Sequence, residues 1–190
     1  MNHQCARRFL RPAAVLLTGT ALLLAGAFLR TQATGNFQPV IPARLYRSGQ
    51  LSAGQLETRI RQCGLKSVVN LRGRNETSGW WRQETELCRR LGVAHLDFTL
   101  SSRKPAGPEQ LDRLAELLRS APKPALVHCQ GGADRTGLAA AVYVYEVEGL
   151  DYERARRQLA ARYGHLPFFK PGSFAMDRSF EAFRRHRERG

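Results

Sequence analysis

The sequence is short of acidic residues. It has 16 aspartates and glutamates against 30 lysines and arginines, which gives a formal net charge of +14 over 190 residues. Such an excess of positive charge attracts anionic partners, among them phosphate esters, anionic lipid headgroups and nucleic acids. The charge therefore restricts the sign of a partner without identifying it.

Nucleic-acid-binding motifs are also missing. The sequence contains no zinc finger, helix-turn-helix or aromatic RNA-binding signature. The basic tail at 184–189 is typical of a solvated helix face or a chain end. No repeat or low-complexity tract appears either, and the length suits one domain plus an extension. We expect no nucleic-acid partner.

Cysteines are few, which argues against a disulfide framework. Cys5 precedes a long apolar run, so three thiols remain beyond it: Cys63, Cys88 and Cys129. Three thiols cannot all pair with one another. A bond between Cys63 and Cys88 is allowed by the sequence and would suit an oxidising compartment.

Charged residues are absent from 12–29. Arg7, Arg8 and Arg11 precede this run and Arg30 closes it, a pattern that predicts a membrane-directed segment. An uncleaved anchor is favoured over a cleaved signal peptide, because the small residues at 25–27 lie inside the apolar run. The N-terminal arginines predict a cytoplasmic N-terminus, which in a bacterium places the remaining chain in the periplasm, tethered to the inner membrane.

The rest of the chain alternates between strand and helix patterns. Residues 1–30 are predicted to be the anchor or signal segment, 31–42 a linker and 43–190 the domain. The predicted strands are 45–48 (at an edge of the sheet), 66–71, 93–99 and 124–128, and the predicted helices are 53–63, 76–91, 108–118, 136–148, 152–163 and 173–187. This order predicts an α/β fold with a central, mostly parallel sheet flanked by helices.

A loop between the last strand and the following helix carries the chemistry. Its residues are Cys129, Gln130, Gly131, Gly132, Ala133, Asp134, Arg135 and Thr136. A glycine-containing loop that opens a helix offers backbone N–H groups to phosphate, and its two glycines permit positive φ angles. The same amides favour a thiolate on Cys129, the predicted nucleophile. Arg135 is expected to bind phosphate in a bidentate manner.

The motif His128-Cys129-x-x-Gly132-x-x-Arg135-Thr136 resembles the signature of the protein tyrosine and dual-specificity phosphatase superfamily. Residues 45–50 and 68–72 resemble the opening segments of its bacterial, dual-specificity-like branch. The resemblance implies the cysteine-phosphatase fold and attack by Cys129 on phosphorus. It also implies phosphate binding by the loop and Arg135, help from Thr136 when the thiolate leaves, and bracing of the loop by His128.

The sequence offers two aspartates as the acid that protonates the leaving group. Asp97 has the separation from Cys129 found in dual-specificity phosphatases, but it lies within a predicted strand. Asp134 precedes Arg135, as in phosphatases whose signature ends in Asp-Arg-Thr and whose loop aspartate is thought to be the acid. Asp134 is favoured, and a loop-stabilising acceptor is its alternative role.

Four further side chains have open roles. Arg47 and Arg72 either flank the pocket or lie on the surface. Trp80 and Trp81 pack on the sheet, form an apolar rim for the substrate, or rest on a membrane interface. The predicted function is hydrolysis of a phosphomonoester, without metal or cofactor, on a phosphoprotein, an anionic lipid or an envelope intermediate. The alternative is a membrane-tethered, phosphate-binding pseudophosphatase, and a sulfur-transfer or arsenate-reducing enzyme is a further rival.

Overall fold

The fold comes from a computed structural model that describes residues 34–169, 172 and 174–189, together with Gly19 and Gly26. The chain divides into two compact units, Met1–Thr34 and Gly35–Gly190, and the fold belongs to the second. No helix within the described ranges is long and apolar enough to cross a membrane. The predicted membrane segment lies outside those ranges apart from its two glycines, so it stays a prediction.

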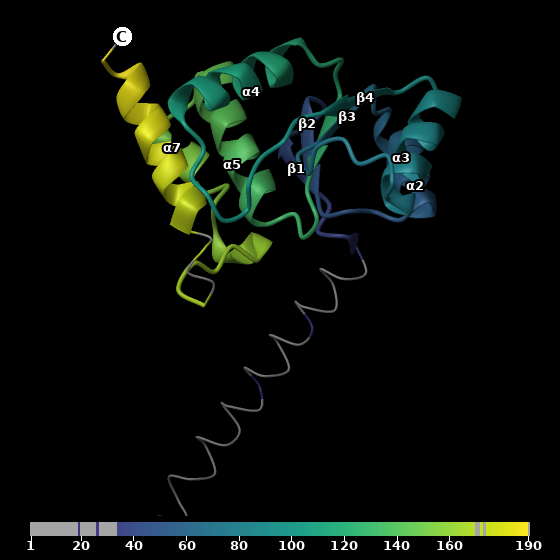
Figure 1. Ribbon diagram of the computed structural model, residues 1–190, viewed down its shortest axis with the longest axis horizontal. Coiled ribbons are helices and arrows are strands. Elements are labelled where there is room, and N and C mark those ends of the chain that lie inside the picture. Colours follow the sequence, from purple (N-terminus) through teal and green to yellow (C-terminus); the bar gives the residue numbers. More distant parts are fainter. Residues whose placement is uncertain (1–18, 20–25, 27–33, 170–171, 173, 190) are drawn as a thin grey trace, which may run out of the picture. The chain divides into compact units, whose positions relative to one another are not determined.

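A five-stranded sheet forms the centre of the domain (Figure 1). Its order is β1-β2-β5-β3-β4, with β2, β5, β3 and β4 parallel and β1 antiparallel at one edge. The strands are β1 (Gln38–Ile41), β2 (Leu45–Ser48), β3 (Ser67–Asn70), β4 (Ala94–Asp97) and β5 (Ala125–His128). The predicted mostly parallel α/β sheet is confirmed.

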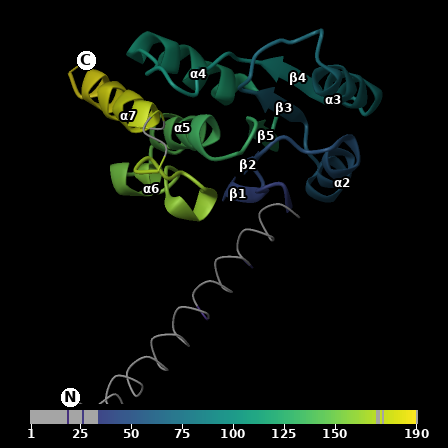
Figure 2. The same ribbon diagram turned by 60° about the horizontal axis from the view of Figure 1, so that its bottom comes forward.

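Helices cover both faces of the sheet (Figure 2). On one face lie α2 (Ala53–Cys63) and α3 (Gly79–Arg90), and on the other lie α4 (Pro108–Ser120), α5 (Asp134–Val142), α6 (Tyr152–Arg156) and α7 (Phe174–Arg187). A capping box in which Ser52 and Gln55 exchange hydrogen bonds begins α2, and Gly64 in the left-handed region ends it.

Alternation along each strand divides the core between the two faces. Val69 and Val127 pack with α4, α5 and α7, whereas their neighbours Val68 and Leu126 pack with α2 and α3. All four side chains are buried. Side chains that are two residues apart on a strand share a face, and this rule determines which helices the residues near Cys129 meet.

Two predictions about the elements are wrong, and one predicted helix differs in its bounds. Residues 38–41 form β1 inside the predicted linker, and β1 covers β2, so β2 is not an edge strand. The helix expected over 136–148 begins at Asp134 and ends as a π-helix at Tyr143–Val147. The helix expected over 152–163 stops at Arg156, and a short 3₁₀ turn, Ala161–Tyr163, follows.

Candidate active site

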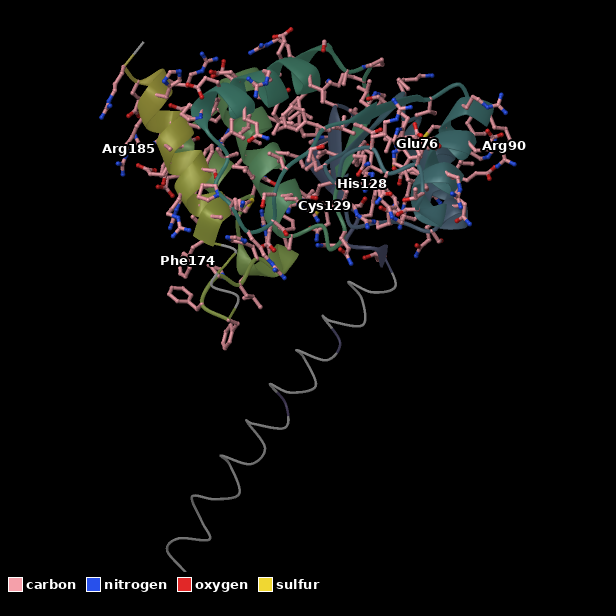
Figure 3. The ribbon with its side chains drawn as sticks, viewed as in Figure 1. Glu76, Arg90, His128, Cys129, Phe174 and Arg185 are labelled. Carbon is pink, nitrogen blue, oxygen red and sulfur yellow. The ribbon has the colours of Figure 1, made fainter. Side chains whose placement is uncertain are left out.

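The predicted loop lies between β5 and α5, where the carboxyl ends of the parallel strands meet. Figure 3 shows His128 and Cys129 near the middle of the domain, between the α2–α3 side and the α7 side that carries Phe174 and Arg185. Cys129 is 3% exposed and belongs to the core on the α5 face. The loop therefore has a rigid base.

Arg47 holds the loop from behind. Its guanidinium donates to the carbonyl oxygens of Gly132 at 3.0 Å and Ala133 at 3.3 Å, and to the backbone and side-chain oxygens of Gln158 at 2.8 and 3.0 Å. It also stacks on the Tyr163 ring, 3.7 Å from the centroid. Burial lowers the pKa of Arg47 to about 10, which leaves it charged at neutral pH. Arg47 is buried, so the predicted surface position is wrong, and it contacts the loop from behind.

The two earlier carbonyls of the loop are also turned outward. Gln130 accepts a hydrogen bond from the backbone N–H of Gln50 at 3.0 Å, and Gly131 accepts one from the Asn36 side chain at 3.3 Å. Since C=O and N–H point in opposite directions across a trans peptide, outward carbonyls turn the following amides inward. Within the described residues, the N–H groups of Gly131, Gly132 and Ala133 have no protein acceptor. The loop is thus built to bind an anion.

One glycine of the loop is required by its backbone. Gly132 has φ of +72°, and a Cβ there would lie 2.5 Å from the nitrogen of Gly49 and 2.6 Å from the carbonyl carbon of Ser48. Gly131 has no positive φ, and a Cβ there would meet nothing within 4 Å. The expectation that both glycines serve positive φ angles therefore holds for Gly132 alone.

A buried carboxylate connects His128 to α3. Glu84 is 4% exposed, and its Oε1 accepts hydrogen bonds from the Nε2 atoms of His128 at 3.0 Å and His95 at 2.9 Å, while Gln50 donates to Oε2 at 2.6 Å. Burial would raise the pKa of Glu84, but the hydrogen bonds and charges of the two histidines outweigh it and lower the pKa to about 2. Glu84 is thus a permanent anion that orients the residue preceding Cys129.

Two arginines approach the mouth of the loop. Arg72 donates to the Gln50 side chain at 2.9 Å and stacks on the Trp80 ring at 3.7 Å. Burial, followed by the positive charge of Arg135, lowers the pKa of Arg72. Across the described part of the chain, Arg135 forms no ion pair or hydrogen bond. Of the two positions predicted for Arg72, the pocket flank is therefore the one observed, and the Trp80 ring supports the guanidinium there.

Asp134, the first residue of α5, is bound to a histidine that the sequence did not single out. His165 Nδ1 lies 2.7 Å from Asp134 Oδ1, and His165 Nε2 lies 3.0 Å from Asp177 Oδ2 on α7. Burial would lower the pKa of His165, but the two carboxylates raise it to about 9. Asp134 thus carries a buried imidazolium as its partner.

The other candidate acid, Asp97, belongs to a different network. Its carboxylate accepts hydrogen bonds from Asn70 Nδ2 at 2.7 Å and from Trp81 Nε1 at 3.1 and 3.2 Å. Asp97 is two residues beyond His95 on β4, so both share the face covered by α3. Trp81 contacts the His95 ring edge-on. It therefore packs on the sheet, which is one of its predicted roles.

The remaining predicted residues lie as follows. Thr136 is buried, and its hydroxyl lies 3.4 Å from the Ser48 carbonyl oxygen. Cys63, Cys88 and Cys129 are all free thiols, so Cys63 and Cys88 are not bonded. No set of three or more potential ligands within the described ranges is arranged to hold a metal ion.

The sequence matches a phosphatase family over most of its length. The family described as "Swiss Army Knife protein, DSP-PTPase phosphatase domain" (PTP-SAK) matches residues 34–177. The chain belongs to this family. This PTP-SAK domain is accordingly a phosphoric monoester hydrolase of the tyrosine and dual-specificity type. No curated protein matches the sequence.

Solved structures of phosphatases share the fold of the PTP-SAK domain. TpbA of P. aeruginosa is 22% identical, with a TM-score of 0.59 over 80% of this chain and 92% of TpbA. The catalytic core of Siw14 from S. cerevisiae is 16% identical, with a TM-score of 0.59 over 75% and 83%. PTPMT1 is 13% identical, with a TM-score of 0.59 over 81% and 99%. At these identities the likeness shows the fold alone.

Sequence reasoning missed most of the residues that support the loop. Glu84 reads as one charge on an amphipathic helix, and Asn36 precedes the predicted domain. His165 lies in an irregular segment without periodicity, and its contact with Asp134 joins residues 31 apart in the chain. The sequence did offer one signal for these supporting contacts. Arg47 is a charged residue inside a short apolar strand, and a charged side chain in such a position must find buried partners.

Proposed function

We propose that this phosphatase hydrolyses a phosphomonoester through a phosphocysteine intermediate on Cys129. The observation that carries the proposal is the loop that follows Cys129 at the end of β5: within the described residues, its N–H groups at 131–133 have no protein acceptor and the Arg135 guanidinium has no hydrogen-bond or ion-pair partner. The thiolate attacks phosphorus, so that an S–P bond forms while the P–O bond to the leaving group breaks. Arg135 and the amides stabilise the charge on the phosphoryl oxygens.

We assign the acid of this first step to Asp134. Its side chain is 22% exposed at the start of α5, within the loop itself, whereas Asp97 is held by Asn70 and Trp81 on the α3 face. The leaving oxygen takes its proton from the Asp134 carboxyl group. Hydrogen bonding to Asn70 and Trp81 gives Asp97 a structural role instead.

Water completes the cycle in a second step. Its oxygen bonds to phosphorus as the S–P bond breaks, and its proton passes to the Asp134 carboxylate, which now acts as the base. Thr136, buried beside the Ser48 carbonyl, lies seven residues after Cys129 at the start of α5 and is proposed to stabilise the departing thiolate. Inorganic phosphate leaves, and the thiolate is restored.

The substrate is proposed to carry an apolar or aromatic group beside its phosphate. Phe168 and Phe169 are 85% and 82% exposed, and they follow His165, which contacts the loop through Asp134. Trp80 stacks on Arg72 and adds a second aromatic ring. A structure of TpbA contains phosphotyrosine, and Siw14 is described as a PP-IP phosphatase. Phosphotyrosine and an anionic lipid or envelope intermediate both fit such a rim.

The apolar run at 12–29 and the arginines before it, Arg7, Arg8 and Arg11, support tethering to the inner membrane with the catalytic domain in the periplasm. Fusions of a periplasm-dependent reporter to the C-terminus test this orientation. Reporter activity in the membrane fraction is expected. An active reporter that requires cytoplasmic folding would contradict it.

The catalytic proposal is tested with p-nitrophenyl phosphate and the full chain. Cys129→Ser is expected to abolish turnover, and Arg135→Ala to reduce it by at least about 100-fold, the usual cost of losing one transition-state donor. Cys63→Ser is the matched control, because Cys63 is a free thiol on α2. Mass spectrometry of acid-quenched enzyme should find phosphate on Cys129. Retained turnover in Cys129→Ser would reject the mechanism, and vanadate binding without any turnover in the unaltered chain would favour a pseudophosphatase.

A further inference from the structure

His165 is a buried histidine outside the signature motif, held between carboxylates from two helices. Its side chain is 1% exposed, with Asp134 of α5 bound to Nδ1 and Asp177 of α7 bound to Nε2. A carboxylate only accepts hydrogen bonds, so both ring nitrogens donate. This geometry requires the imidazolium form, with one proton on each nitrogen.

The surroundings of His165 stabilise that form. Asp134 and Asp177 are the charged groups that act on it, and they raise its pKa to about 9 in spite of burial. Nδ1, which carries a proton at neutral pH, therefore lies 2.7 Å from Oδ1 of Asp134 in the loop. His165 thus holds a proton next to Asp134, the residue assigned as the acid.

A lone aspartate is a poor acid at neutral pH. An ordinary aspartic acid, with a pKa of about 3.9, is ionised in all but about one molecule in a thousand at pH 7. Because Asp134 accepts a hydrogen bond from the His165 imidazolium as a carboxylate, it can donate a proton only after a neighbouring group has supplied one. The hydrogen bond to His165 is the direct route from such a group.

We propose that His165 is a positioning residue that supplies, and later recovers, the proton that Asp134 exchanges with the leaving group and with water. The inference rests on the function proposed above. The Nδ1 proton of His165 moves to Asp134 Oδ1, and as the P–O bond breaks the leaving oxygen takes this proton from the Asp134 carboxyl group, which becomes a carboxylate again. His165 is then neutral. When water attacks the phosphocysteine, its proton passes to Asp134 and the Nδ1 proton returns, so no proton is gained or lost over the cycle apart from those of the products.

Asp177 has a separate part in this arrangement. It holds Nε2 from α7 at 3.0 Å, and its charge favours the imidazolium when Asp134 is neutral. Replacing Asp177 by asparagine keeps a hydrogen-bonding side chain but removes that charge. The variant Asp177→Asn should therefore weaken proton supply without removing the ring.

The test compares His165→Gln with the unaltered full chain on two substrates. Phenyl phosphate has a poor leaving group that needs an acid, whereas p-nitrophenyl phosphate has a good one. The kcat for phenyl phosphate is expected to fall about 100-fold, the lower range for general acid catalysis, and the kcat for p-nitrophenyl phosphate by about threefold or less. The basic limb of the phenyl phosphate pH profile, near the pKa of about 9 of His165, should move to lower pH, and Asp177→Asn should move it less.

His186→Gln is the matched control, because His186 also faces a carboxylate, Asp112, but on the exposed end of α7. Its profile is expected to match the unaltered chain. Equal losses on both substrates with an unmoved pH profile in His165→Gln and Asp177→Asn would show a purely structural role and overturn the proposal. No loss at all would overturn it too. Either result leaves the Cys129→Ser test of the proposed function untouched, since that test concerns p-nitrophenyl phosphate and the thiol.

Discussion

The guanidinium of Arg47 lies behind the phosphate loop and donates to the Gly132 carbonyl oxygen at 3.0 Å. Both residues are buried, and the contact joins the middle of β2 to a loop 85 residues later. A cation in this position turns carbonyl oxygens away from the phosphate site and adds positive potential beneath it. The shape of the loop thus depends on a strand residue outside the signature motif.

Replacing Arg47 by methionine is expected to destabilise the domain and weaken phosphate binding. Three buried oxygen acceptors, on Gln158 and Gly132, lose this donor, and the part-buried Ala133 oxygen loses one of its two donors. The free energy of unfolding should therefore fall by about 3 kcal/mol or more. The KM for p-nitrophenyl phosphate should rise. Urea unfolding and steady-state kinetics measure the two effects.

Two further variants sharpen the Arg47 experiment. Arg47→Lys keeps the charge but not the planar fork, so it should recover part of the stability and less of the KM. Arg44→Met is the surface control, since Arg44 is 54% exposed. Unchanged stability and KM in Arg47→Met would show that the loop keeps its shape without this support.

Gly132→Ala and Gly131→Ala form a matched pair one residue apart. A Cβ on Gly132 would overlap Gly49 and Ser48 at a φ of +72°, whereas a Cβ on Gly131 meets nothing within 4 Å. Vanadate affinity is expected to fall at least about tenfold in Gly132→Ala, because strain at such a position costs on the order of 1–3 kcal/mol. Gly131→Ala should bind nearly as well as the unaltered chain. Similar losses in both variants would contradict the loop geometry.

Most of the elements could be predicted from the sequence because their physical causes are local. The strand Leu45–Ser48 and the helix Ala53–Cys63 have the predicted bounds, since alternation, the Ser52 cap and Gly64 determine them. The strand β1 was missed because it is short, antiparallel and contains Pro39, which sequence rules assign to a linker. Residues 157–160 have helical composition, yet the chain leaves the helix there to bring Gln158 to Arg47.

The residues of the candidate site also fall into two groups, those that the sequence could identify and those that it could not. The loop residues could be identified because their motif is contiguous, whereas His165 and Glu84 reach it through tertiary contacts 31 and 44 residues apart. The period of two along β4 turns Asp97 toward α3, but the choice between Asp97 and Asp134 needed the partners of each carboxylate. Those partners come from packing and not from the local sequence.

Cys88 and Cys129 should differ in reactivity toward iodoacetamide in the native chain. Burial, together with the negative charge of Glu84, raises the pKa of Cys88 to about 12, so its thiolate is scarce at neutral pH. Cys129 lies in the anion-binding loop and should be the thiol that phosphate or vanadate protects. Peptide mapping after brief labelling measures both sites. Labelling of Cys88 before Cys129, or labelling of Cys129 that vanadate does not slow, would contradict this assignment.

Glu84 should make the stability of the domain depend on acid pH. Its pKa in the folded chain is about 2, below the ordinary value of 4.5, so its stabilising effect is complete above pH 4.5 and is lost as the pH falls toward 2. A shift of this size corresponds to about 3 kcal/mol. Urea unfolding of the unaltered chain and of Glu84→Gln, at about pH 5 and about pH 3, should show a gap in unfolding free energy that narrows at the lower pH. Glu86→Gln is the control on the exposed side of α3 and should show almost no gap at either pH. If the gap for Glu84→Gln stayed constant, the carboxylate would not be the ionised acceptor of His128 and His95, and the orientation of the histidine before Cys129 would need another cause.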